Sequence, residues 1–297
     1  MRAPERGFLL LSSCLGDPAR HPLTTAQLRI LADRSWQMDG VDTEQDITPE
    51  DLAALGYGTS MARRIVDLLS QEDVLDHYLT RARRVGCIPL TRVSEGYPLR
   101  LRKRLGLDSP GVLWVKGDLE ILNTPKIALV GSRDLLEENR RFAQEVGRQA
   151  ALQGYALVSG NARGADRTAQ DSCLEAGGSV ICVVADELSR QPDRENVLFL
   201  SEEDFDAPFT AQRAISRNRV IHALGEKTLV AQCSYGTGGT WDGTVKNLRF
   251  GWSDVFCFAD GTESMARLEQ MGAALIPPEP LSNLAGLIPN TRNLFDQ

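Results

Sequence analysis

The sequence has few of the features that mark a fibrous, membrane-embedded or disordered protein. It has no low-complexity tract and no fixed repeat, and no apolar run approaches the roughly 18 residues of a membrane span. The apolar run 8–11 is also too short for a signal h-region, so we interpret it as a buried helix turn. With 297 residues, 42% hydrophobic and 25% charged, the chain is long enough for two domains, each with a buried core.

Cysteine is scarce and scattered. The six cysteines form no CxxC pair, and no histidine stands at metal-binding spacing from them. We therefore expect reduced cysteines in a cytoplasmic protein, with no metal site and no membrane association.

The usual nucleotide-binding and catalytic fingerprints are missing as well. There is no GxxxxGK[ST] loop, no GxGxxG after the first strand and no GxSxG, which argues against an ATPase, a dinucleotide dehydrogenase and a serine hydrolase. The three histidines lie far apart, and only His222 is near a candidate site. A single helical histidine is more often structural, so we expect a protein that is not an enzyme and has no cofactor.

Positive charge is not in excess. The formal net charge of −7 argues against a protein that coats nucleic acid non-specifically, although a local basic groove is compatible with it. Segment 81–104 carries eight basic residues and a single acid, Glu95. A solvated charged face is the simpler explanation for any one of them, so the cluster favours a polyanionic partner only modestly.

The stretch around which the chain is organised runs from Lys126 to Asp166. It contains an apolar strand (126–130), a helix that ends near Gly154 and a second strand (155–158). A helix of this length joins parallel strands, so the pattern predicts a βαβ unit. Both strands end in Gly/Ser/Arg turns at the strand carboxyl ends, where ligands bind in open parallel sheets.

The remaining pattern divides the chain into two domains. Residues 4–85 are typical of helices, and an N-terminal helical domain is expected over 1–86. An extended Rossmann-like α/β domain, doubly wound with a mostly parallel sheet, is expected over 87–297, including an irregular seam at 87–125. We interpret the polar segment 186–209 as a loop, and 212–224 as one helix.

One element of the helical domain resembles a helix-hairpin-helix. An apolar helix, the turn Gly56-Tyr57-Gly58 and a second helix follow the start signal Thr48-Pro49. Such glycines allow backbone N–H groups to approach a DNA phosphate. A plain helical hairpin that only packs is an equally good interpretation.

Four glycine or arginine turns map to one edge of the predicted sheet. Their glycines allow backbone N–H groups to reach phosphate, and arginine binds phosphate oxygens through two parallel hydrogen bonds without a metal. Together they predict a polyanion pocket; Asp166 could equally be a helix cap or hold an arginine in place. The predicted phosphate-binding residues are Gly131, Ser132, Arg133, Ser159, Gly160, Asn161, Arg163, Gly164, Asp166, Arg217, Asn218, Arg219, Gly236, Thr237, Gly238, Gly239 and Thr240.

The order of these motifs resembles the DNA-processing protein A (DprA/Smf) family. The resemblance implies single-stranded DNA binding in a basic pocket, a homodimer, and loading of a RecA-type recombinase during DNA uptake in natural transformation. By this resemblance, the residues expected to contact phosphate are Arg133, Arg163, Arg217 and Arg219. The series is Tyr97-Pro98-x-x-Leu101, Val130-Gly131-Ser132-Arg133, Ser159-Gly160-x-Ala162-x-Gly164-x-Asp166, Ser201-Glu202, Arg217-Asn218-Arg219 and the turn Gly236-Thr237-Gly238-Gly239-Thr240.

Several positions depart from the family pattern. Gln170 stands where a histidine is frequent, Trp241 where a small residue is expected, and the loop 187–200 looks shortened. We therefore expect a divergent member without the C-terminal winged helix that some members carry.

Two other functions remain open. A nucleotide sensor or phosphoribohydrolase-like protein would share the fold, but Trp241-Asp242-Gly243 replaces the glutamate of the GGxGTxxE loop, which favours sensing over hydrolysis. A structural adaptor acting through the helical domain leaves the arginine turns unexplained.

Overall fold

The structure is a computed structural model that describes residues 1–35, 47–277 and 281–290. Residues 36–46 of the predicted helical region lie outside the described residues. The chain divides into two compact units, and neither is one continuous segment. The predicted boundary between residues 86 and 87 stays a prediction. The first unit comprises Met1–Tyr97, Pro110–Trp114 and Glu202–Asp206, and the second comprises Pro98–Ser109, Val115–Ser201 and Ala207–Gln297.

The first unit is mainly helical. The buried pair Leu9 and Leu10 lies on its first helix, which confirms the buried helix turn expected there. A cluster around Leu52, Ile65 and Leu68 forms the core between the later helices. The elements are α1 (Ala3–Ser12), α2 (Thr25–Ser35), α3 (Pro49–Ala54), α4 (Thr59–Leu69), α5 (Glu72–Arg84) and β1 (Cys87–Thr91), with β2 (Val112–Gly117) divided between the two units.

Local sequence signals start the helices of this unit. Thr48 accepts a hydrogen bond from the backbone N–H of Asp51 at 3.2 Å, and the Asp51 carboxylate accepts one from the N–H of Thr48 at 2.8 Å. This reciprocal pair is a capping box, and it confirms the helix start that the sequence predicts at Thr48-Pro49.

The second unit contains a parallel sheet whose strand order reverses. In its sheet the strands run in the order β6-β5-β4-β3-β7-β8-β9, and every pairing is parallel. The strands are β3 (Lys126–Val130), β4 (Ala156–Ser159), β5 (Val180–Val183), β6 (Val197–Ser201), β7 (Lys227–Val230), β8 (Asp254–Phe258) and β9 (Ala274–Ile276).

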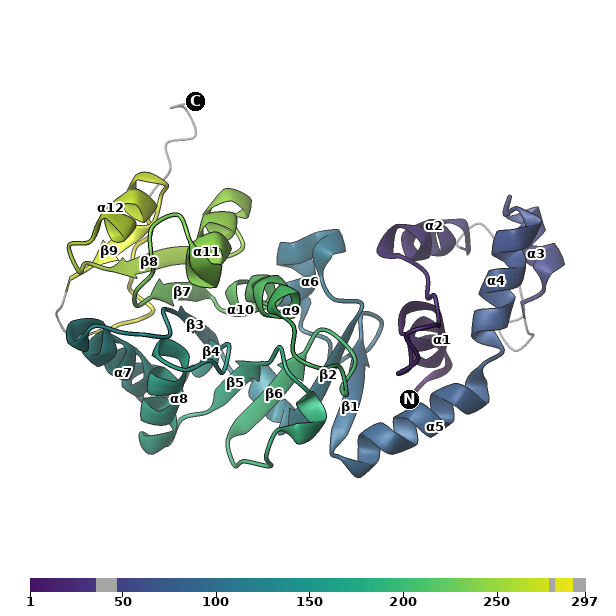
Figure 1. The fold of residues 1–297 in the computed structure, drawn as a ribbon, viewed down its shortest axis with the longest axis horizontal. Coiled ribbons are helices and arrows are strands. Elements are labelled where there is room, and N and C mark those ends of the chain that lie inside the picture. Colours follow the sequence, from purple (N-terminus) through teal and green to yellow (C-terminus); the bar gives the residue numbers. More distant parts are fainter. Residues whose placement is uncertain (36–46, 278–280, 291–297) are drawn as a thin grey trace. The chain divides into compact units, whose positions relative to one another are not determined.

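Helices cover both faces of this sheet. Figure 1 shows α7 and α8 on one side of the strands and α11 and α12 on the other. The chain moves outward from β3 in one direction and then returns to place β7 on the other side of β3, which is the doubly wound arrangement predicted from the sequence. The helices are α6 (Leu99–Leu105), α7 (Glu137–Leu152), α8 (Ala165–Glu175), α9 (Ala211–Ser216), α10 (Asn218–Leu224), α11 (Gly238–Phe250) and α12 (Glu263–Gln270), with 3-10 turns at Gly106–Asp108, Leu119–Asn123 and Leu188–Arg190.

Two predictions about this unit were wrong. The segment predicted as a loop, 186–209, contains strand β6, which pairs with β5 through Val180 and Val197. All five residues of β6 are buried, so sheet pairing and burial on both faces override its polar flanks. The helix predicted over 212–224 is two helices, which meet at Arg217.

Candidate anion-binding site

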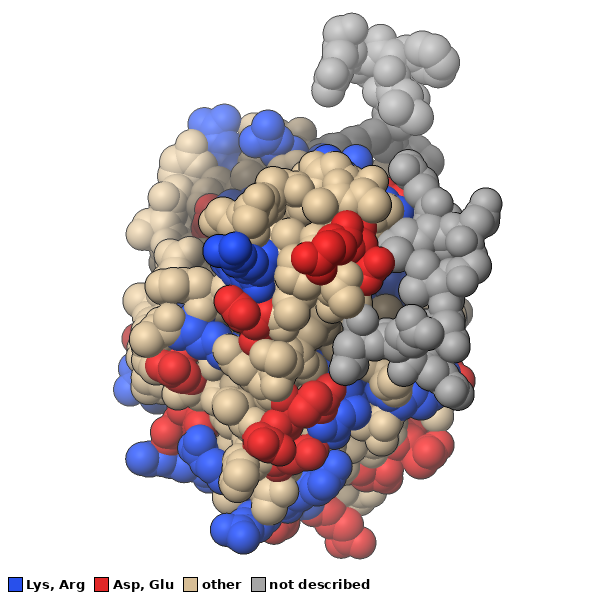
Figure 2. Space-filling view, turned by 90° about the vertical axis from the view of Figure 1, so that its right-hand side faces the viewer, with Lys and Arg blue, Asp and Glu red and all other residues tan. Residues whose placement is uncertain are grey.

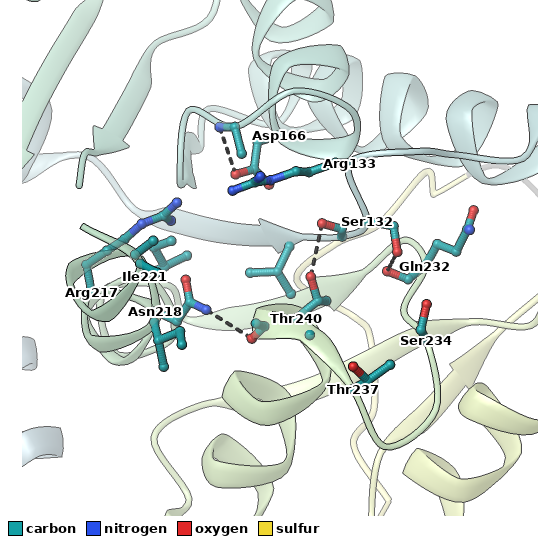
Figure 3. Close-up of a pocket in the computed structure, with 18 of the residues that line it drawn as sticks. Ser132, Arg133, Asp166, Arg217, Asn218, Ile221, Gln232, Ser234, Thr237 and Thr240 are labelled. Carbon is teal, nitrogen blue, oxygen red and sulfur yellow. Dashed lines mark hydrogen bonds between the residues drawn. The ribbon is translucent and has the colours of Figure 1, made fainter. Parts of the chain in front are cut away.

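A pocket lies where the strand order reverses. A cavity of about 640 Å³ opens beside the carboxyl ends of β3, β4 and β7. In open α/β sheets the crevice outside this switch point is where ligands bind. Its lining is Val130, Gly131, Ser132, Arg133, Asp134, Ala162, Asp166, Phe209, Ala211, Ala214, Ile215, Arg217, Asn218, Ile221, His222, Gln232, Ser234, Thr237, Gly238, Gly239 and Thr240 (Figure 3).

Close packing explains the glycines of the first two turns. A Cβ on Gly131 would lie 2.4 Å from the Cβ of Ala165, and a Cβ on Gly160 would lie 1.6 Å from the Arg217 guanidinium. Gly164 has φ +84°, and a Cβ there would lie 2.3 Å from the carbonyl oxygen of Arg133. No L side chain fits at these positions without moving its neighbours, so the two turns are packed directly against each other.

Asp166 holds the second turn together from inside. Its carboxylate is buried and accepts hydrogen bonds from the backbone N–H groups of Gly160 at 3.0 Å and Ala162 at 3.2 Å. Burial raises the pKa of Asp166, while Arg217, these two donors and Arg133 act in the opposite direction. The side chain therefore fixes the backbone of its own turn, and the predicted roles as a helix cap or as a partner of Arg133 or Arg219 stay predictions.

The two arginines of the pocket have different surroundings. Arg217 is only 7% exposed, and its Nη2 donates to the carbonyl oxygen of Gly160 at 2.9 Å. Arg133 is exposed, and Figure 3 shows its guanidinium lying beside Asp166. We therefore distinguish a fixed buried cation from an exposed one that an incoming anion can reach.

The far side of the cavity is the N-terminus of α11. Thr237 is the N-cap residue, but its side chain makes no capping hydrogen bond. The turn is fixed instead from both sides, because Thr240 donates to the carbonyl of Gly131 at 3.0 Å and Asn218 donates to the carbonyl of Gly239 at 3.0 Å (Figure 3). The first N–H groups of a 13-residue helix therefore line the pocket, where the helix dipole favours an anion.

Sequence analysis missed the apolar wall of the pocket. Phe209, Ile215 and Ile221 lie on the pocket lining, and Phe209 is 56% exposed. No local pattern distinguishes these residues from ordinary core or surface positions. The exposure of Phe209 only becomes notable once it is seen beside the glycine turns.

Other predicted site residues lie outside the lining. Arg163 is exposed and forms an ion pair with Asp134 at 2.8 Å. Arg219 donates to the carbonyl of Asp108 at 3.1 Å and to Ser216. Gly160 and Gly164 shape the turns from behind, and Ser159, Asn161 and Gly236 also lie off the lining.

His222 lines the pocket, but its surroundings indicate a structural role. His222 is 1% exposed, and burial lowers its pKa to about 3. Its Nδ1 accepts a hydrogen bond from the Asn247 amide at 3.1 Å. Ser132, for its part, donates to the carbonyl of Gln232 at 3.3 Å. The neutral, buried imidazole is therefore occupied with packing, and the groups that face the cavity are suited to holding an anion.

The basic segment 81–104 is divided between the two units. Arg81 pairs with Asp206 at 2.8 Å in the first unit, whereas Arg100 pairs with Glu226 at 3.0 Å in the second. Figure 2 shows Lys and Arg interspersed with Asp and Glu on the face that it draws. Among the described residues no group of three or more His, Cys, Asp and Glu could hold a metal ion, and no described helix is long and apolar enough to cross a membrane.

Fold and site together define a Rossmann-like protein with a pocket at its topological switch point. The chain belongs to the family described as DNA recombination-mediator protein A, whose sequence model matches residues 89–246. Protein Smf of Escherichia coli (strain K12) is 29% identical over 209 residues, which cover 64% of this chain and 55% of that protein. The chain spans about half the length of the curated relatives it matches.

Two solved structures share the fold. The X-ray structure of DNA processing protein A from Streptococcus pneumoniae has a TM-score of 0.64 and 23% identity, covering 86% of this chain and 95% of that one. DNA processing protein A from Helicobacter pylori, described as having a unique single-stranded DNA binding mode, has a TM-score of 0.54 and 22% identity, covering 64% and 90%. At these identities the two structures show the fold.

Proposed function

We propose that this chain is a non-catalytic single-stranded DNA-binding protein whose switch-point pocket holds the phosphates of the strand. The observation that carries the proposal is the convergence of Arg133, the turn after β3 and the N-terminus of α11 on one cavity. All three offer donors to an oxyanion, and none of them needs a metal. Family membership and the description of the Helicobacter pylori protein support DNA as the polyanion.

The first experiment measures binding of a labelled oligo-dT strand by fluorescence anisotropy. Arg133→Ala removes the exposed pocket cation, whereas Arg141→Ala removes an equally exposed cation on α7 that pairs with Glu137. The two variants have the same net charge. We expect Arg133→Ala to weaken binding by roughly 10- to 100-fold, because a hydrogen bond to a charged group contributes about 1.5–3 kcal/mol.

Salt adds a second readout to this experiment. Each phosphate contact contributes a log–log slope of about −0.7 for single strands, so Arg133→Ala should flatten the slope by roughly that amount. Arg141→Ala should change affinity less than about twofold, since it lies away from the lining. Equal losses in both variants would show that binding follows net charge alone and would contradict the pocket.

A second candidate function is the sensing of a small nucleotide. The cavity of about 640 Å³ has the size of a small-molecule site, and Phe209, Ile215 and Ile221 give it an apolar wall. ATP, AMP and ADP-ribose therefore serve as competitors and as ligands in thermal melts. Stabilisation by one of them, with no binding of oligo-dT, would favour the sensor over the DNA-binding protein.

We further propose that the protein protects processed DNA and loads a RecA-type recombinase as a homodimer in natural transformation. Family resemblance alone supports this step. The test measures strand-dependent ATP hydrolysis by a RecA-type recombinase on DNA coated with a single-strand-binding protein, while sedimentation gives the oligomeric state. A recombinase that starts no faster with the wild-type chain than with Arg133→Ala would contradict loading through this pocket.

A further inference from the structure

Two aromatic side chains flank the glycine turn that forms one side of the pocket. Tyr235 precedes the lining residues Thr237–Thr240, and Trp241 follows them. Their ring centroids lie 5.0 Å apart with the ring planes at 82°, so the edge of one ring meets the face of the other. Neither ring belongs to the pocket lining itself.

Core packing does not account for this pair. Tyr235 is 51% exposed and Trp241 is half-buried. A pair that core packing does explain is Phe142 and Phe258, which stack at 4.6 Å and are both buried. An aromatic pair left open beside a site is unusual, because exposing a large ring forfeits the gain from burying it.

The backbone holds the pair in a fixed place relative to the pocket. Ser234 and Thr237 form a β-bridge that closes the turn, and Gly236 and Gly238 have φ +69° and +85°. Trp241 stands in the first turn of α11, directly after Thr240, which donates to the carbonyl of Gly131. The rings therefore move with the phosphate-binding turn.

A cation stands beside the pair. The Arg267 guanidinium carbon, which α12 supplies, lies 5.9 Å from the centre of the Tyr235 ring. Arg267 is half-exposed and pairs at 3.7 Å with Glu263. An exposed ring, a second ring that supports it and a nearby cation are the elements from which single-strand proteins build a stacking platform.

We propose that Tyr235 and Trp241 form a stacking platform for an unpaired nucleobase adjacent to the phosphate in the pocket. The inference rests on the proposed function and names the part of the ligand that the second contact recognises. Every base has a π-face, so the platform tolerates any sequence, but it requires a strand whose bases are free of pairing. The phosphate pocket supplies the electrostatic part of binding, and the platform supplies a part that salt does not weaken.

The test compares two strands that differ only in their bases. One is an oligo-dT, and the other is an abasic strand of equal length with the same phosphates. We expect Tyr235→Ala to weaken oligo-dT binding by about 5- to 100-fold, the range that stacking of one base implies. Binding of the abasic strand should change less than about twofold, and the salt slope should stay at the wild-type value.

Phe250→Ala provides the matched control. Phe250 is also an exposed aromatic residue, 59% exposed, and it lies at the opposite end of α11, roughly 14 Å along the helix from Trp241. This variant should bind both strands like the wild type. Tyr235→Leu keeps apolar contact with Trp241 but lacks a ring, so it separates stacking from packing if Tyr235→Ala lowers the melting temperature.

The outcomes separate this inference from the proposed function. A wild-type chain that binds neither strand overturns both. Should the wild type bind oligo-dT while Tyr235→Ala and Tyr235→Leu bind it equally well, the platform is refuted and the phosphate pocket stands. Quenching of tryptophan emission by oligo-dT that disappears in Trp241→Phe, with affinity kept, would support the platform directly.

Discussion

Glycine turns occur both in the helical hairpin and in the pocket, and they are built in different ways. In the hairpin between α3 and α4, Gly56 has φ +82° and its added Cβ would meet only an Arg34 nitrogen at 3.8 Å, while Gly58 has open space around it. In the pocket, Gly131, Gly160 and Gly164 have no room for a Cβ. The hairpin turn is a local structure, whereas the pocket turns exist only because three strands bring them into contact.

The difference matters because a turn of suitable shape makes a good binding site only when its surroundings hold it in place. An open turn can approach a phosphate, and the hairpin turn is held by local backbone hydrogen bonds, from Gly56 N–H to Ala53 at 2.9 Å and from Tyr57 N–H to Leu52 at 3.0 Å. In the pocket, Asp166 and Arg217 are buried and bind the backbone of the same turn. These side chains fix the second turn, so the donors that line the cavity, Arg133 and the N-terminus of α11, lie beside a preorganised wall. We therefore propose the pocket as the anion site, and the hairpin remains a predicted DNA contact.

The largest expected effect is that of Gly164→Ala. The variant combines φ +84° with a Cβ 2.3 Å from a backbone carbonyl oxygen, which no rotamer can relieve. We expect a loss of about 3–5 kcal/mol from backbone strain and overpacking together. Gly56→Ala has nearly the same φ without the clash and should cost about 1–2 kcal/mol.

Urea unfolding with hydrogen exchange measures the two units separately. Equal losses for Gly164→Ala and Gly56→Ala would remove the distinction between the packed and the open turn. The two glycines have almost the same φ, so any additional loss of unfolding free energy in Gly164→Ala measures the clash of its added Cβ.

A second prediction concerns how stability depends on pH through His222, a buried residue that lines the pocket. His222 has a pKa of about 3 in the folded protein, lowered by burial from 6.5. The unfolded chain therefore binds a proton that the folded chain does not, and the contribution of His222 to stability is full above pH 6.5 and declines as the pH falls towards 3. The decline should approach about 1.4 kcal/mol per pH unit.

Unfolding free energies between pH 6.5 and 5 test this, because most carboxylates stay ionised in that range. His222→Gln cannot take up this proton. The unfolding free energy of the variant should therefore fall less steeply with falling pH than that of the wild type, by up to about 1.4 kcal/mol per pH unit. An unchanged slope would mean that the imidazole titrates freely in the folded state. Only the two slopes of unfolding free energy against pH are compared, so a change in the variant's stability at a single pH does not affect the result.

Sequence predicted the parts of this fold whose signals are local. Strand β3 and the glycine turn after it form an apolar run that ends in Gly131, and the structure places both where the pattern predicts. Strand β6 was missed because its four apolar residues and Ser201 lie between polar segments, and only pairing with β5 makes them a strand. The sequence contains the apolar residues of β6 but does not show that β5 pairs with them.

The candidate site divides in the same way. Glycine and arginine turns are visible in a sequence, so Arg133 and Arg217 could be named in advance. Their roles could not, because burial of Arg217 and the pairing of Arg163 with Asp134 depend on neighbours that are distant in the chain. The apolar wall around Phe209 has no motif at all and follows only from tertiary packing.

The smallest expected effect lies in the hairpin, at Thr48. Thr48→Ala removes the side-chain cap of α3 and should cost about 1 kcal/mol, while Thr48→Ser keeps the hydroxyl and should cost much less. Faster hydrogen exchange confined to 49–54 would report the frayed helix. The cap is entirely local, so the pocket should keep its own exchange protection.

Strand affinity of the same variant then decides whether the hairpin takes part in binding. If only the pocket binds DNA, Thr48→Ala should bind oligo-dT like the wild type, because Arg133 and the N-terminus of α11 are unchanged. A loss of affinity with Thr48→Ala that Thr48→Ser restores would show that the hairpin contacts the strand. The open turn at Gly56-Tyr57-Gly58 would then approach a phosphate of the strand, as its lack of close neighbours allows.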